Sequence, residues 1–128
     1  MMSNIQQKEK RILLVEDEAS YRTVVLTTLR KAGLNCTFCV DGDHAIKKLA
    51  QEKYDLIIVD YLLPGPNGIE IIQWARKQGI DIPALIITNY PSDDLDKTNK
   101  ALGHTKILAK SLFTTSSIPA IVQGLLTP

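Results

Sequence analysis

Five side chains with the chemistry of a catalytic or metal-binding site close or follow short apolar stretches of this sequence. They are Glu16, Asp17, Asp60, Thr88 and Lys110. Carboxylates held close together repel one another, and a hard divalent cation such as Mg²⁺ relieves that repulsion by binding their oxygens. A cation, an ammonium group and a hydroxyl around one carboxylate neutralise charge on a phosphoryl group during its transfer. These residue types therefore indicate phosphoryl chemistry, with Asp60 as the nucleophile that forms an acyl phosphate.

The stretches that carry these residues have the pattern of buried strands. Short, evenly apolar runs are typical of strands that are covered on both faces in a parallel sheet. The predicted strands cover residues 11–15, 36–40, 54–60, 83–88 and 106–110. Helical patterns alternate with them, so we expect an α/β fold with a parallel sheet and helices on both faces.

This architecture explains why the five polar side chains should meet. In an open parallel α/β sheet, ligands bind beyond the carboxyl ends of the strands. Each polar residue could simply be the first solvated residue after a strand, but stability alone does not call for three acids at one edge. The loop from Pro64 to Gly68, directly after the strand that ends in Asp60, is expected to shape the pocket beside it.

Composition favours one domain and excludes several classes of protein. The chain has 128 residues, 45% of them hydrophobic, which suits a single core. A net charge of +1 argues against a nucleic-acid-binding surface or a polybasic membrane patch. No apolar run approaches a membrane span, and the polar amino terminus lacks the core of a signal peptide, so we expect a cytoplasmic protein. Residues 1–10 are predicted to be a flexible lead, and residues 11–126 the folded domain.

Cys36 and Cys39 form a C-x-x-C sequence that we interpret as structural. Redox pairs of this kind lie at a helix amino terminus, whereas these two fall in a predicted strand. Side chains three residues apart on a strand point to opposite faces of the sheet. The two thiols are therefore expected to be separated by the sheet.

Four motifs, taken together and in order, resemble the receiver domain of two-component response regulators. They are LLVEDE at 13–18, LIIVDYLLPGPNG at 56–68, ALIIT at 84–88 and ILAK at 107–110. The resemblance covers about residues 11–126. It implies a flavodoxin-like fold in which five parallel strands have the order 2-1-3-4-5.

The resemblance also implies a role for each residue of the acidic set. Asp60 matches the phosphoacceptor of the family. Glu16 and Asp17 match the acid pair that, with Asp60, holds Mg²⁺. Leu62 matches the position whose backbone carbonyl completes the metal shell.

Thr88 and Lys110 match the two residues that contact the phosphoryl group in the family. Receivers take this group from a sensor histidine kinase or a phosphotransfer protein, and signal through the surface that here corresponds to residues 92–102, 106–110 and 118–125. Such a chain catalyses only its own phosphorylation and dephosphorylation, so it is not expected to be an enzyme in the usual sense. We expect no direct contact with nucleic acid or membrane, and the downstream effector stays open, as does whether the chain is a single-domain regulator or part of a longer protein.

Two positions on the signalling side depart from the family. Ile107 stands where an aromatic residue is usual, and its branched side chain is stiff. Ser111 stands where a proline with a cis peptide bond is usual, so we expect a trans Lys110–Ser111 bond. A pseudo-receiver that binds partners without being phosphorylated therefore stays an alternative, although the intact acid set argues against it. A phosphohydrolase with an aspartate nucleophile would need a second acid where this chain has Leu62.

Overall fold

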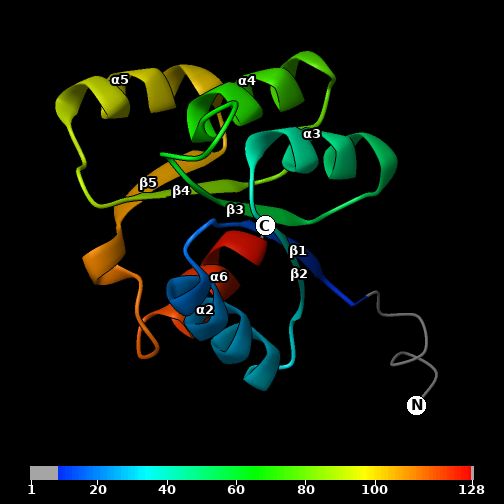
Figure 1. Cartoon of the computed structure of the whole chain (residues 1–128), viewed down its shortest axis with the longest axis vertical. Helices are drawn as coiled ribbons and strands as arrows, with labels where there is room; N and C mark the ends of the chain where they lie inside the picture. Colours follow the sequence, from blue (N-terminus) through cyan, green and yellow to red (C-terminus); the bar gives the residue numbers. More distant parts are fainter. Residues whose placement is uncertain (1–8, 128) are drawn as a thin grey trace.

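A single five-stranded sheet forms the centre of the computed structural model, which describes residues 9–127 (Figure 1). All neighbouring strands are parallel, in the order β2-β1-β3-β4-β5. The strands are β1 (Arg11–Val15), β2 (Asn35–Cys39), β3 (Leu56–Asp60), β4 (Ala84–Thr88) and β5 (Thr105–Ala109). The predicted fold class and strand order are confirmed.

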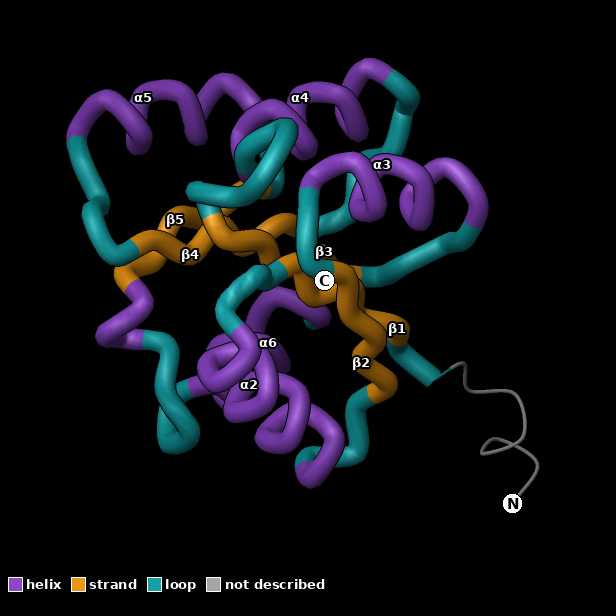
Figure 2. Tube along the Cα trace, viewed as in Figure 1, coloured by secondary structure: helices purple, strands orange, loops and turns teal. Residues whose placement is uncertain are grey.

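Helices cover both faces of this sheet. Figure 2 shows α3, α4 and α5 along one face, and α2 and α6 along the other. Their bounds are α2 (Ala19–Lys31), α3 (Gly42–Gln51), α4 (Gly68–Lys77), α5 (Asp93–Leu102) and α6 (Ile118–Leu126). A short 3-10 helix, η1 (Lys110–Leu112), follows β5.

Alternation along the strands divides the core into two hydrophobic clusters. In β1, Leu13 and Val15 belong to the cluster under α3, α4 and α5, whereas Ile12 and Leu14 belong to the cluster with α2 and α6. All four side chains are fully buried. Burial on both faces is the reason that β1, β3 and β4 have evenly apolar sequences, whereas the edge strands β2 and β5 are only partly buried.

The same alternation separates the two cysteines. Cys36 lies in the cluster with α2 and α6, and Cys39 lies in the cluster on the opposite face. Both are buried and free, and burial raises the pKa of Cys36 to about 12 and that of Cys39 to about 11. The structural interpretation is confirmed, because buried thiols that stay protonated are unreactive.

Several predicted strand ends were wrong by one or two residues. β3 begins at Leu56 instead of residue 54, because the Asp55 carboxylate accepts a hydrogen bond from the Arg11 backbone N–H at 2.8 Å outside the ladder. β5 ends one residue before Lys110, because the Phe113 N–H donates to the Lys110 carbonyl at 3.0 Å and turns the chain into η1. Lys110 therefore follows the strand and does not close it.

Two further expectations concern the ends and peptide bonds of the chain. The predicted flexible lead over residues 1–10 lies almost entirely outside the described residues. Within residues 9–127, every peptide bond is trans, so the prediction for Lys110–Ser111 is confirmed. Over the same range, none of the helices has the length and apolar character needed to cross a membrane.

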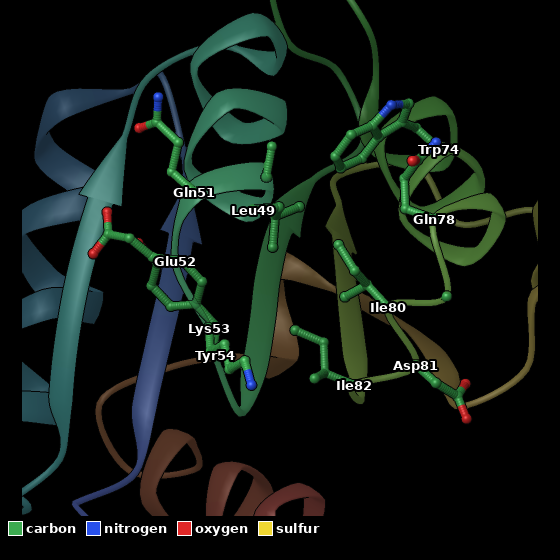
Figure 3. A pocket seen from close by; sticks show the side chains of 12 residues that line it. Leu49, Gln51, Glu52, Lys53, Tyr54, Trp74, Gln78, Ile80, Asp81 and Ile82 are labelled. Carbon is green, nitrogen blue, oxygen red and sulfur yellow. The ribbon is translucent and has the colours of Figure 1, made fainter.

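A hollow of about 590 Å³ opens at the amino ends of β3 and β4, between the carboxyl ends of α3 and α4. Figure 3 shows Leu49, Trp74, Ile80 and Ile82 around it. This is the edge of the sheet opposite to Asp60. The residues with predicted phosphoryl chemistry therefore lie elsewhere, in a site that is built from strand ends.

Candidate functional site

The candidate site lies at the carboxyl edge of the sheet. Asp60 is the last residue of β3, and Thr88 is the last residue of β4. Glu16 directly follows β1, and Lys110 directly follows β5. The register brings these ends level, because Asp60 lies beside Ile87 of the neighbouring strand. Four segments that are far apart in the sequence thus deliver polar side chains to one place.

Three carboxylates form a compact cluster at this edge. One oxygen from each of Glu16, Asp17 and Asp60 lies within 4.8 Å of the other two. Glu16 is fully buried, Asp60 is 7% exposed, and Asp17 is open to solvent. The strand-end argument therefore placed these acids together correctly.

Lys110 binds two of the three acids. Its ammonium Nζ lies 2.9 Å from Oδ2 of Asp60 and 3.0 Å from Oε1 of Glu16, and its side chain is only 11% exposed. One ammonium thus faces three carboxylates when Asp17 is included. The excess of negative charge makes this edge of the sheet attractive to a cation.

Burial and neighbouring charges shift the pKa values of Glu16 and Lys110. Burial raises the pKa of Glu16 to about 7, against the opposing effect of the Glu18 backbone N–H and of Lys110. For Lys110, burial alone would lower the pKa, but its hydrogen bonds to Asp60 and Glu16 outweigh this and raise the pKa above the ordinary value. The ammonium therefore stays charged beside Asp60 at neutral pH.

The residues present fit a magnesium ion. Mg²⁺ prefers a few carboxylate oxygens together with waters, and the open side chain of Asp17 leaves one flank of the cluster accessible. Leu62 lies next to this flank, because its backbone N–H donates to Oδ1 of Asp60 at 3.3 Å. The assignment of its carbonyl to a metal shell stays a prediction.

Thr88 is held in place by the turn that follows it. Its side chain is 1% exposed, and its hydroxyl oxygen accepts a hydrogen bond from the Tyr90 N–H at 3.1 Å. The O–H of a threonine that accepts in this way can still donate to a second group. Leu62 and Tyr90, which are 59% and 76% exposed, lie at the outer rim of the site.

The loop after Asp60 is fixed by close backbone contacts. The Gly42 N–H, at the start of α3, donates to the Pro64 carbonyl at 3.2 Å, and a side chain on Gly42 would collide with the Pro66 carbonyl. The Gly68 N–H donates to the Tyr61 carbonyl at 2.9 Å. The loop is thus held between α3 and α4, which fits its predicted role beside Asp60.

Residues 12–123 match the response regulator receiver domain. The chain belongs to this family. It is 34% identical over 118 residues to the alkaline phosphatase synthesis transcriptional regulatory protein PhoP of Bacillus subtilis, and the match covers 91% of this chain and 48% of PhoP. The receiver thus spans about half the length of this curated relative.

Solved structures of receivers superpose closely on the chain. The chemotaxis response regulator CheY4 of Vibrio cholerae matches with a TM-score of 0.83 and 29% identity, over 92% of this chain and 99% of CheY4. TrrA of Thermotoga maritima, in complex with Mg²⁺-BeF, matches with a TM-score of 0.79 and 29% identity, over 91% of this chain and 98% of TrrA.

Two residues that contact the site were missed by sequence reasoning about this receiver. Arg22 lies on α2, where its Nη1 donates to the Glu16 carbonyl at 3.0 Å, and its guanidinium lies 4.8 Å from the centre of the Phe38 ring. Tyr21, also on α2, lies against Lys110. Neither contact has a signal in the sequence, since both depend on how α2 packs beside the strand ends.

The two departures from the receiver pattern lie beside this site. Ile107, in β5, packs against the cluster under α3, α4 and α5 and is only partly buried. Ser111 lies in η1 and is exposed. Neither residue touches the three acids through an ion pair or hydrogen bond among those found in residues 9–127. The acidic site itself is therefore built without them.

Proposed function

We propose that this receiver domain accepts a phosphoryl group on Asp60 in a reaction that requires Mg²⁺. The observation that carries the proposal is the position of the Lys110 ammonium, 2.9 Å from Asp60 and 3.0 Å from Glu16, inside the cluster of three carboxylates. This arrangement combines a carboxylate nucleophile, a fixed positive charge and a set of oxygen ligands for a hard cation.

Each residue has a defined part in the transfer. An Asp60 carboxylate oxygen forms a bond to phosphorus as the bond between phosphorus and the phosphohistidine nitrogen breaks, and the electron pair of that bond stays on the imidazole. Lys110 exchanges its carboxylate partner for a phosphoryl oxygen, and the Thr88 hydroxyl donates to another. Bound Mg²⁺, held by Glu16, Asp17, Asp60 and the Leu62 carbonyl, supplies further neutralisation of charge.

The partners follow from this chemistry. The donor is a sensor histidine kinase or a phosphotransfer protein, and the folded unit is residues 11–126, acting in the cytoplasm. Output runs through the surface formed by α5, β5 and α6. The domain turns over only its own acyl phosphate, since the position two residues after Asp60 is a leucine and offers no general acid.

A direct test uses a small acyl phosphate as donor. The protein is incubated with the donor and either Mg²⁺ or a chelator, and intact mass is measured. One phosphoryl adduct is expected only with Mg²⁺, and Asp60→Asn should abolish it. Asp93→Asn, at an exposed acid in α5, is the matched control and should behave as wild type.

The pseudo-receiver is the second candidate, because Ile107 and Ser111 both lie on the signalling side. It predicts no adduct at saturating donor. It also predicts that Asp60→Asn binds the downstream partner as tightly as wild type does. An adduct on Asp60 that changes partner affinity excludes it.

A further inference from the structure

Tyr21 contacts both ends of the segment that carries Lys110. It lies in the first turn of α2, and the centre of its ring is 4.8 Å from the Lys110 ammonium. Its hydroxyl donates a hydrogen bond to the carbonyl of Phe113 at 2.9 Å, across 92 positions of sequence. One side chain thus joins the charged end of Lys110 to the residue that follows η1.

Buried neighbours hold the Tyr21 side chain in place. Phe113 is fully buried in the cluster with α2 and α6, so the carbonyl that receives the hydrogen bond has a fixed position. Burial raises the pKa of Tyr21 to about 12, so its hydroxyl stays a donor throughout the physiological range. The ring is half-buried and packs against the same cluster.

The Lys110 side chain needs such support when its charge partners change. In the structure the ammonium is held by two carboxylates, Asp60 and Glu16. A cation bound at the acidic cluster interacts with the same carboxylate oxygens and weakens their attraction for the Lys110 ammonium. The face of an aromatic ring attracts an ammonium independently of those carboxylates, and more strongly when water is excluded.

We propose that Tyr21 is a positioning residue that keeps the Lys110 ammonium beside Asp60 while its partner changes from a carboxylate to a phosphoryl oxygen. The inference rests on the proposed phosphorylation of Asp60. The ring fixes the ammonium, and the hydroxyl fixes η1, from which the Lys110 side chain extends.

Two substitutions at Tyr21 separate these two contacts. Tyr21→Leu removes the ring and the hydroxyl but keeps an apolar side chain, and it should slow phosphorylation by a small acyl phosphate about tenfold. Tyr21→Phe keeps the ring and loses only the bond to Phe113, so a smaller loss of about threefold is expected. The Mg²⁺ affinity should match wild type in both variants.

Tyr54→Leu is the matched control. Tyr54 is also a tyrosine beneath a cation, with the Arg11 guanidinium 4.9 Å from its ring centre, but it lies at the opposite edge of the sheet. Its substitution should lower the thermal midpoint without slowing phosphorylation of the folded protein. A loss of rate equal to that of Tyr21→Leu would show that general destabilisation is the cause, and would overturn the inference.

An NMR measurement tests the contact itself. The ε-methylene protons of Lys110 should be shifted upfield by the Tyr21 ring in wild type and in Tyr21→Phe, and this shift should be absent in Tyr21→Leu. Wild-type phosphorylation kinetics in Tyr21→Leu, or a parallel loss of Mg²⁺ affinity, would overturn the proposed role of Tyr21. Absence of any adduct on the wild-type protein would instead contradict the proposed function.

Discussion

We expect Leu62 to influence how water reaches the phosphorus of an acyl phosphate on Asp60, from the side opposite the aspartyl oxygen. It lies two residues after Asp60, its N–H donates to the Asp60 carboxylate, and its side chain is 59% exposed at the rim of the site. A leucine has no atom that can hold or polarise a water molecule. The acyl phosphate formed at Asp60 should therefore be long-lived for a receiver, because hydrolysis needs a water in line with the bond that breaks.

Leu62→Asn should shorten that lifetime, by roughly tenfold, because an amide can orient the attacking water. The measurement is the decay of phosphorylated protein after the donor is removed. Leu112→Asn serves as control, since Leu112 has nearly the same exposed fraction, 60%, and should leave the decay unchanged. Equal decay in wild type and Leu62→Asn would show that water access is not limited at this position.

Glu16 should make the affinity for Mg²⁺ depend on pH. Burial raises its pKa to about 7, so below that pH the proton competes with the metal for the carboxylate. Affinity should fall as the pH drops below 7, by at most about tenfold per pH unit, and level off above it. Calorimetric titration at pH 6, 7 and 8 measures this. Glu16→Gln should flatten the profile, and a flat profile in wild type would contradict the assignment.

At the scale of elements, α3 and the loop after β3 are joined by a contact that only glycine allows. A Cβ on Gly42 would collide with the Pro66 carbonyl. Gly42→Ala should therefore lower the free energy of unfolding by about 2 kcal/mol or more, because the loop or the helix must move. Urea unfolding measures the loss.

Gly124→Ala provides the control for the Gly42 prediction. Gly124 lies in α6, where a Cβ would meet nothing within 4 Å. The same chemical change should there raise the free energy of unfolding by about 0.5–1 kcal/mol, since alanine favours the helix. Equal effects at the two positions would show that the Gly42 contact does not constrain the loop.

Helix α5 is held to the domain by fewer buried side chains than α4. Leu95 is its only buried residue among those described, whereas α4 buries five. Segments with few buried contacts open at lower free energy. Backbone amides of α5 should thus exchange hydrogen faster than those of α4, as measured by mass spectrometry, and equal protection would refute this.

Arg76 joins α4 to the carboxyl end of α5. From α4, its guanidinium donates to the carbonyls of Leu102 at 3.0 Å and of Gly103 at 3.0 Å. It therefore fixes the turn between α5 and β5. We expect the fast exchange to concentrate in the amino-terminal half of α5, with the carboxyl end protected.

For the whole molecule, features that depend on the local sequence pattern could be predicted, whereas features that depend on packing between elements could not. The three central strands could be found because burial on both faces leaves evenly apolar runs. The shared direction of the strands then placed Glu16, Asp17 and Asp60 together. The change from β5 to η1 at Lys110 could not be found, since it depends on a backbone bond from Phe113.

The contact between Tyr21 and Lys110 could not be predicted from the sequence either. It arises from the way in which α2 packs beside the end of β5, and no spacing rule links residues so far apart in sequence. The hold of Gly42 on the loop after β3 also depends on a close approach in space. Sequence patterns identify which elements exist, while contacts between elements depend on three-dimensional packing.

The separation of the two cysteines gives each layer of the domain its own chemical reporter. Cys36 lies beneath α2 and α6, and Cys39 lies beneath the helices of the other face. A thiol reagent can reach either sulphur only when the layer above it lifts or the whole domain unfolds. The labelling rates of single-cysteine variants would therefore report the opening of each layer separately. A difference between the two rates would show which side of the sheet opens more readily.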